Sequence, residues 1–244
     1  LGGSVITAKD EPETLDEAAI ERAAAAVAGT DERVVVVHGG GSFGHHHATR
    51  HGVSRTDGTR DASAVREIHG AMQRLNDAMV GALADDGVAA VPVHPFSAAS
   101  RGRDGALELP TGQVGRLLDE GFVPVLHGDV IAHAGAGATI VSGDELVVAL
   151  ADGLAADRVG LCSAVPGVLD ADGAVIDRID AFDDVAAVLG ESDAADVTGG
   201  MAAKVSTLLD LATPASIFAL DDLAAFFDGE NPGTLVGGGG SDGA

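Results

Sequence analysis

The chain has 244 residues, of which 38 are Asp or Glu and 14 are Lys or Arg, giving a formal net charge of −24. Nucleic acids and anionic membranes repel such a chain, so we expect neither as a partner. Hydrophobic residues make up 46% of the sequence, enough for a large core, and the single cysteine, Cys162, excludes a disulfide framework. No apolar run is long enough to cross a membrane, and we expect a cytoplasmic enzyme.

Segments rich in β-branched residues predict strands, which alternate with Ala-rich segments that predict amphipathic helices. The predicted strands are 34–37, 88–93, 122–126, 138–141, 158–162 and 215–220. The predicted helices are 15–28, 62–85, 112–120, 144–155 and 201–212. This alternation predicts an α/β fold, a three-layer αβα sandwich with a mainly parallel open sheet, in one domain over residues 1–236.

Two segments are expected to lack regular structure. The segment 97–112 carries Arg101, Arg103 and three glycines, a composition typical of a surface loop. Residues 237–244 are dominated by glycine and have almost nothing to pack, so we predict a flexible tail.

A glycine-rich segment, His38 to Gly44, follows the predicted strand 34–37. Glycines after a buried strand let backbone N–H groups approach an anion closely, and a helix that begins nearby adds the positive end of its dipole. The segment therefore predicts an anion-binding turn.

Other patterns fit the same segment less well. Gly39, Gly41 and Gly44 match the dinucleotide fingerprint, with Asp57 or Asp61 at the spacing of a ribose-binding acid, but adjacent glycines match that pattern easily. A nucleophile elbow and an oxyanion loop also match, yet those two motifs lie on separate loops in esterases. A nicotinamide-dependent oxidoreductase stays open as an alternative function.

Three histidines, His45, His46 and His47, follow directly. Adjacent side chains diverge on a helix or a strand, so the run is not the spacing of a metal site. We expect one histidine, His45, to face a ligand beside Gly44 and the other two to face solvent.

The chain contains two lysines, Lys9 and Lys204, and each follows a pair of glycines, Gly2-Gly3 and Gly199-Gly200. A lysine ammonium is a compact, mobile charge suited to a phosphoryl group, so both lysines are candidates for phosphate chemistry. The P-loop pattern is absent from the sequence, which excludes a P-loop kinase. Ser142-Gly143-Asp144 lies where a strand meets a helix, and Ser142 or Asp144 is equally well explained as a helix cap.

Together these motifs resemble the amino acid kinase superfamily. They occur in its order: Gly2-Gly3-Ser4 with Lys9, the segment from His38 to His45, Ser142-Gly143-Asp144, Thr198-Gly199-Gly200-Met201 with Lys204, and Pro232-Gly233-Thr234. Within the superfamily, Gly-Gly-Gly-Ser-Phe-Gly-His and Thr-Gly-Gly-Met resemble the archaeal isopentenyl phosphate kinases. The acidic, lysine-poor composition is similar to that of proteins from salt-loving archaea.

The resemblance implies transfer of a phosphoryl group from ATP, with Mg²⁺, to isopentenyl phosphate by an enzyme that is usually a homodimer. It places the acceptor in the N-terminal half and the nucleotide in the C-terminal half. The implied catalytic residues are Lys9 and His45. The implied ATP-binding residues are Gly2, Gly3, Gly41, Gly200 and Lys204, and the acceptor phosphate is assigned to Gly40, Gly44, His45 and Gly143.

The predicted helix 62–85 carries an apolar stripe that includes Ile68, Met72 and Met79. Such a stripe normally packs in the core, but the resemblance also implies that one end of this helix lines a pocket for the isoprenoid tail. A sibling kinase that acts on another small phosphate or phosphonate, such as fosfomycin, stays open as an alternative.

Overall fold

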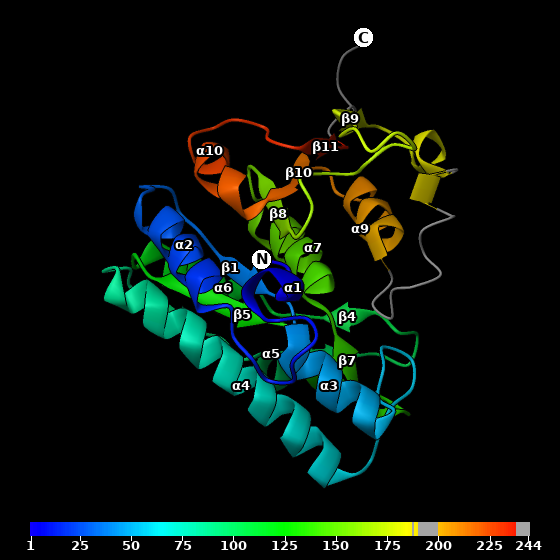
Figure 1. The fold of residues 1–244 in the computed structure, drawn as a ribbon. Helices are drawn as coiled ribbons and strands as arrows, with labels where there is room; N and C mark the ends of the chain where they lie inside the picture. The colour runs from blue at the N-terminus through cyan, green and yellow to red at the C-terminus, as the bar shows by residue number, and fades with distance from the viewer. Residues whose placement is uncertain (187, 190–199, 238–244) are drawn as a thin grey trace. The chain divides into compact units, whose positions relative to one another are not determined.

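The computed structural model describes residues 1–186, 188–189 and 200–237 (Figure 1). The chain divides into two compact units, Leu1–Ala149 and Leu150–Ala244, which we call the first and the second unit. No helix among the described residues has the length and apolar character needed to cross a membrane.

The first unit contains helices of very different lengths. They are α1 (Gly3–Ile6), α2 (Glu17–Ala28), α3 (Gly41–His51), α4 (Ala62–Asp85), α5 (Pro95–Ala98) and α6 (Gly112–Asp119). The long helix α4 packs along α2 and α3, as Figure 1 shows in cyan and blue. Its buried stripe includes Ile68, Met72, Leu75 and Met79, so the helical spacing read from the sequence marks its core face.

The strands of the first unit form two sheets. One has the order β1 (Val36–His38), β5 (Val123–His127) and β2 (Ala90–Pro92), with both pairings parallel. The other has the order β4 (Leu107–Glu108), β3 (Ser100–Arg101), β6 (Asp129–His133) and β7 (Gly137–Val141). In the first sheet His38 pairs with His127, so the carboxyl ends of β1 and β5 lie side by side.

Helix α7 (Gly143–Leu154) begins in the first unit and ends in the second. The second unit has a sheet of order β8 (Val159–Ser163), β10 (Ala215–Ala219), β11 (Thr234–Val236) and β9 (Arg178–Ile179). Its described helices are η1 (Phe182–Asp184), α9 (Gly200–Leu209), η3 (Leu220–Asp222) and α10 (Leu223–Phe227).

The predicted α/β class with mainly parallel pairing is confirmed. Five described strand pairs are parallel and three are antiparallel, distributed over the three sheets. Each predicted strand and helix has an observed counterpart, and α4 has the predicted bounds. One kinase domain over residues 1–236, with the acceptor and the nucleotide in separate halves, stays a prediction.

The prediction that residues 97–112 form a surface loop is wrong in part. It contains the antiparallel pair β3 and β4, and Arg101 is only 4% exposed. The Arg101 guanidinium lies 3.0 Å from Glu145 Oε1 and donates to the Gly105 carbonyl, so a partly buried ion pair and a hydrogen bond order this segment. Of the predicted tail 237–244, only Gly237 lies within the described residues, and its N–H donates to the Ile179 carbonyl.

Candidate active site

Two glycine turns of the first unit are packed backbone against backbone. A Cβ on Gly3 would lie 2.1 Å from the Gly41 nitrogen, and one on Gly39 would lie 2.7 Å from the Gly3 nitrogen. No side chain can enter such a contact, which explains glycine at both turns. The structure therefore brings Gly2 and Gly3 together with the turn at 39–41. The assignment of Gly2, Gly3 and Gly41 to ATP and of Gly40 to the acceptor phosphate stays a prediction.

The hydroxyl of Thr7 joins the same two turns. Thr7 Oγ1 donates to the Gly3 carbonyl at 2.8 Å and accepts from the Ser42 N–H at 3.0 Å. Gly41 has a φ of +48°, and a Cβ there would lie 2.3 Å from this hydroxyl. Glycine is therefore required at position 41 for two reasons: the backbone is left-handed there, and the Thr7 hydroxyl leaves no space for a side chain.

Two further glycines approach the turn at 39–41 from other strand ends. A Cβ on Gly128, directly after β5, would lie 3.4 Å from the Gly143 nitrogen and 3.7 Å from the Gly40 nitrogen. One on Gly143 would lie 3.3 Å from the His38 carbonyl oxygen. The first turns of α3 and α7 consequently begin beside each other, and the amino ends of two helices favour an anion between them.

Ser142 caps α7, as one of the two readings of its motif predicted. Its Oγ accepts from the Glu145 N–H at 3.1 Å, while the Glu145 carboxylate accepts from the Ser142 N–H at 3.0 Å. This reciprocal capping box fixes the start of α7 and keeps Gly143 beside the glycine turn. Asp144, half-buried, presents a further carboxylate at this helix start.

His45 lies in the first turn of α3 and is exposed. Its Cδ2 is 3.6 Å from the position of a Cβ on Gly40, so the imidazole lies beside the glycine turn. On the opposite side, a Cβ on Gly44 would lie 2.7 Å from Met72 Sδ, which holds this part of α3 against α4. The structure thus places Gly40, Gly44 and His45 at one end of α3.

The expectation that His46 and His47 both face solvent is wrong for His47. His46 is exposed, but His47 is 8% exposed and its Nε2 lies 2.6 Å from Glu13 Oε1. The reason is helical geometry: two residues after His45, the side chain points to the buried side of α3.

Lys9 is exposed and lies in the loop between α1 and α2. Thr14 N–H donates to Ser42 Oγ at 3.4 Å and Ala8 N–H donates to the Thr14 carbonyl at 3.0 Å, so the far end of this loop is attached to the start of α3. Lys9 is therefore carried by a loop whose base belongs to the glycine turns.

Ile68, Met72 and Met79, predicted to line a tail pocket, are 1%, 1% and 0% exposed. Ile68 packs with Val130 and Ala138. The core reading of the stripe is confirmed, and its second role as a pocket wall stays a prediction.

The predicted nucleotide residues Gly200 and Lys204 lie in the second unit. Gly200 starts α9 with a φ of +47°, and Lys204 is half-buried one turn further along that helix. Thr198 and Gly199 of the same motif lie outside the described residues. The contact of these residues with a nucleotide stays a prediction.

Sequence reasoning missed two buried histidines at the ends of β1 and β5. Burial lowers the pKa of His38 from 6.5 to about 4 and that of His127 from 6.5 to about 4. The two rings stack 5.6 Å apart, and His127 Nε2 lies 2.9 Å from His94 Nδ1. The only signal in the sequence was their position at predicted strand ends beside glycines.

These pKa values predict loss of stability in mild acid. Because the folded pKa lies below the unfolded one, the unfolded chain binds more protons between pH 6.5 and 4, and stability falls as the pH drops through this window. At pH 5 we expect the free energy of unfolding to be lower by about 2 kcal/mol for each histidine. Denaturant unfolding at constant KCl from pH 7 to 5 measures it, and the exposed-site variant His46→Gln should give the same slope. Unchanged stability over this range would contradict the expectation.

Comparison with known proteins identifies the family. The chain matches the amino acid kinase family over residues 1–218. The chain belongs to the amino acid kinase family. It is 66% identical over 240 residues to the isopentenyl phosphate kinase of Haloferax volcanii, covering 98% of this chain and 97% of that one. It is 31% identical over 223 residues to the isopentenyl phosphate kinase of Methanocaldococcus jannaschii, covering 85% and 84%.

A solved structure described as "X-ray structures of isopentenyl phosphate kinase" superposes on this member of the kinase family with a TM-score of 0.78. The two share 26% sequence identity, and the match covers 97% of each chain. The predicted fold and the resemblance drawn from the motifs are both confirmed.

Proposed function

We propose that this chain is an isopentenyl phosphate kinase that uses ATP. The observation that carries the proposal is the 66% identity to the Haloferax volcanii enzyme, which extends over 98% of the chain. The geometry of the first unit supports a phosphate acceptor, because α3 and α7 begin side by side and His45 lies beside Gly40.

In the proposed reaction an oxygen of the acceptor phosphate attacks the γ-phosphorus of ATP. The bond from that phosphorus to the bridging oxygen breaks, its electron pair leaves with ADP, and isopentenyl diphosphate is formed. The acceptor is already an anion, so no general base is needed. Catalysis then consists mainly of positioning the two phosphates and stabilising the charge on the transferred group.

We assign the acceptor phosphate to Gly40, Gly44 and Gly143, with His45 donating a hydrogen bond to it. Lys9 neutralises charge on the transferring phosphoryl group, a role suited to an exposed ammonium on a loop attached to the glycine turns.

ATP is assigned to five residues. Gly2, Gly3 and Gly41 border its phosphates, because the two glycine turns are packed together and glycine backbone N–H groups can approach an anion closely. Gly200 and Lys204, at the start of α9, are also assigned to the nucleotide.

The proposal includes Mg²⁺, which when bound to ATP neutralises phosphate charge. This ion prefers oxygen ligands, usually one or two carboxylates together with substrate phosphates. The chain offers a fitting group in Asp144, at the capped start of α7 and next to Gly143. It further includes a homodimer working in a salt-rich cytoplasm, in keeping with the family and with the net charge of −24.

The decisive experiment is a coupled ADP-release assay in concentrated KCl with a panel of acceptors. We expect turnover with isopentenyl phosphate to exceed that with dimethylallyl phosphate, fosfomycin and acetylglutamate. A preference for fosfomycin or another phosphonate would replace the proposed acceptor. Stabilisation by NAD instead of magnesium ATP in a thermal-shift measurement would point to an oxidoreductase.

The proposed pocket for the isoprenoid tail can be tested at Met72, whose sulfur lies against Gly44. Met72→Ala should cost about 2 to 5 kcal/mol of stability because the side chain is buried. Trimming the pocket wall should also raise turnover with geranyl phosphate relative to isopentenyl phosphate, by roughly 10-fold and at most about 200-fold. Met79→Ala, two turns further along α4, tests how far the pocket extends. An unchanged substrate ranking in both variants would contradict the pocket assignment.

A further inference from the structure

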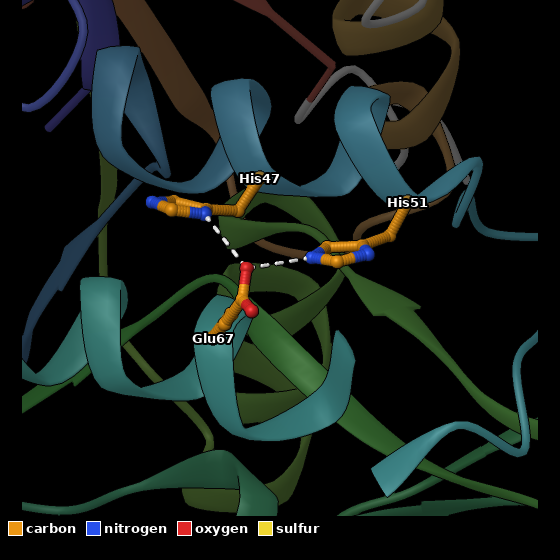
Figure 2. A group of neighbouring side chains, drawn as sticks. All are labelled: His47, His51 and Glu67. Atoms are coloured by element: carbon orange, nitrogen blue, oxygen red, sulfur yellow. Dashed lines mark hydrogen bonds and ion pairs between the residues drawn. The ribbon is translucent and has the colours of Figure 1, made fainter. Parts of the chain in front are cut away.

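Three side chains that can bind a metal ion lie together between helices α3 and α4, away from the glycine turns. His47 and His51 lie four residues apart on one face of α3, and Glu67 reaches up between them from α4 (Figure 2). Their ligand atoms all lie within 4.8 Å of one another. Two imidazoles and one carboxylate on facing helices form a common donor set for a transition-metal ion.

Glu67 interacts differently with the two histidines. His51 Nε2 lies 2.8 Å from Glu67 Oε2, a direct hydrogen bond, whereas His47 Nδ1 lies 3.9 Å from the same oxygen (Figure 2). His47 Nδ1 is buried and has no hydrogen-bond partner among the described residues. A buried polar atom without a hydrogen bond lowers the stability of the fold. Because His47 Nδ1 faces a carboxylate oxygen, it points to a ligand shared by the two groups.

Glu13 determines which nitrogen of His47 is available. Its Oε1 lies 2.6 Å from His47 Nε2, and Arg74 holds the other carboxylate oxygen at 2.7 Å. With the proton on Nε2 donated to Glu13, the lone pair of Nδ1 points toward Glu67. A carboxylate behind a ligating imidazole is the usual outer-sphere arrangement of zinc sites, where it fixes the ring and increases its basicity.

We propose that His47 Nδ1, His51 Nε2 and Glu67 bind a zinc-type divalent ion, with Glu13 orienting His47. A tetrahedral zinc ion holds its ligand atoms roughly 3.3 to 3.5 Å apart. The ligand atoms here are 2.8 Å, 3.9 Å and at most 4.8 Å apart, so the side chains must rearrange to surround the ion. On binding, His51 Nε2 gives up the proton that it donates to Glu67, and the neutral ring carries its proton on Nδ1 instead. Three protein ligands leave a fourth position for water.

Charges around the site allow the ion to enter. Arg50 lies 3.2 Å from Glu67 Oε2, and its side chain is 59% exposed, so it can turn into solvent when the ion takes its place. Glu13 and Glu67 contribute two carboxylates, which are paired with Arg74 and Arg50 respectively. When Arg50 turns away, the Glu67 carboxylate needs another cation, and the bound ion supplies that charge.

The position of the site gives it a structural role. His47 and His51 belong to the helix that begins at the glycine turn and carries His45, while Glu13 belongs to the loop that carries Lys9. An ion here would join α3, α4 and that loop at one point. We expect it to stabilise the fold at the base of the glycine turns without contacting a substrate. The inference does not depend on which acceptor the enzyme phosphorylates.

The test uses the full chain after treatment with a chelator, in concentrated KCl and without nucleotide. Zn²⁺ is titrated against a chromophoric chelator, and Co²⁺ is added separately to record the strong visible absorption of a tetrahedral complex. We expect one Zn²⁺ per chain, a raised melting temperature and a tetrahedral Co²⁺ spectrum. Excess Mg²⁺ should not displace Zn²⁺, because magnesium avoids imidazole ligands.

The variants His51→Gln and Glu67→Gln should each weaken Zn²⁺ binding by about tenfold or more and abolish the tetrahedral Co²⁺ spectrum. The matched control His46→Gln removes an exposed histidine of the same helix and should bind as the parent does. Metal-free melting temperatures check that each variant is folded. Absence of one-to-one binding, or equal binding by the parent and both site variants, would overturn the proposal.

Discussion

His45→Ala is expected to reduce kcat/KM for isopentenyl phosphate by about 30-fold or more while leaving the KM for ATP nearly unchanged. The substitution removes a hydrogen bond to a charged acceptor, which is worth on the order of 2 kcal/mol or more. Stability should change little, because His45 is exposed on the first turn of α3. Steady-state kinetics with each substrate varied in turn measures both constants.

His46→Ala is the matched control for this variant, since His46 is also exposed and is the next residue on the helix. It should retain parental kinetics. Equal losses in the two variants would show that the helix start as a whole, and not the His45 imidazole, supports catalysis.

Gly3→Ala is expected to have the largest combined effect on stability and activity. The new methyl group would lie 2.1 Å from the Gly41 nitrogen and 2.6 Å from its Cα, so backbone, not a flexible side chain, must move. We expect a loss on the order of 3 kcal/mol in unfolding free energy and loss of most activity, because the methyl group forces the two glycine turns apart. Urea unfolding in concentrated KCl and the ADP-release assay measure the two effects.

Gly81→Ala serves as the control substitution of the same kind. Gly81 lies inside α4, where a Cβ meets no atom of the described residues within 4 Å outside the helix backbone. Alanine there should raise stability by about 1 kcal/mol through helix propensity and leave activity unchanged. Parental stability and activity of Gly3→Ala would mean that the two glycine turns are not in contact in the working enzyme.

Much of the fold was predictable from the sequence because its long elements have clear periodicity. Helix α4 was predicted with its observed bounds, since Asp61 caps it and its apolar residues recur at helical spacing. Shorter elements gave too few residues for a period. The sequence of α3 is dominated by glycine and histidine, which are poor helix formers, and its helix is imposed by packing against α4. The pair β3 and β4 was taken for a loop because its ordering contact, from Arg101 to Glu145, is distant in sequence.

The candidate site was predictable to a similar extent. Glycines at strand ends indicated a phosphate site, and the structure brings these glycines into contact in the first unit, while phosphate binding stays a prediction. His47 and His51 have the four-residue spacing that converges on a helix, but the glycine- and histidine-rich sequence of α3 does not itself predict a helix. Their partners Glu13 and Glu67 come from other segments, so sequence spacing alone gave no sign of them.

The loop that carries Lys9 is short and closed at its base. Ile6 and Ala8 hydrogen-bond through their backbones with Asp16 and Thr14, while the residues at the tip, from Lys9 to Glu11, are exposed. The base of the loop is therefore tied to the protein by backbone hydrogen bonds, whereas Lys9 stands at its exposed tip. If Lys9 acts on the transferred phosphoryl group as proposed, an ammonium on so short a loop can reach that group without displacing the glycine turns to which the loop is attached. A large lid would then not be needed to bring the cation to the reaction.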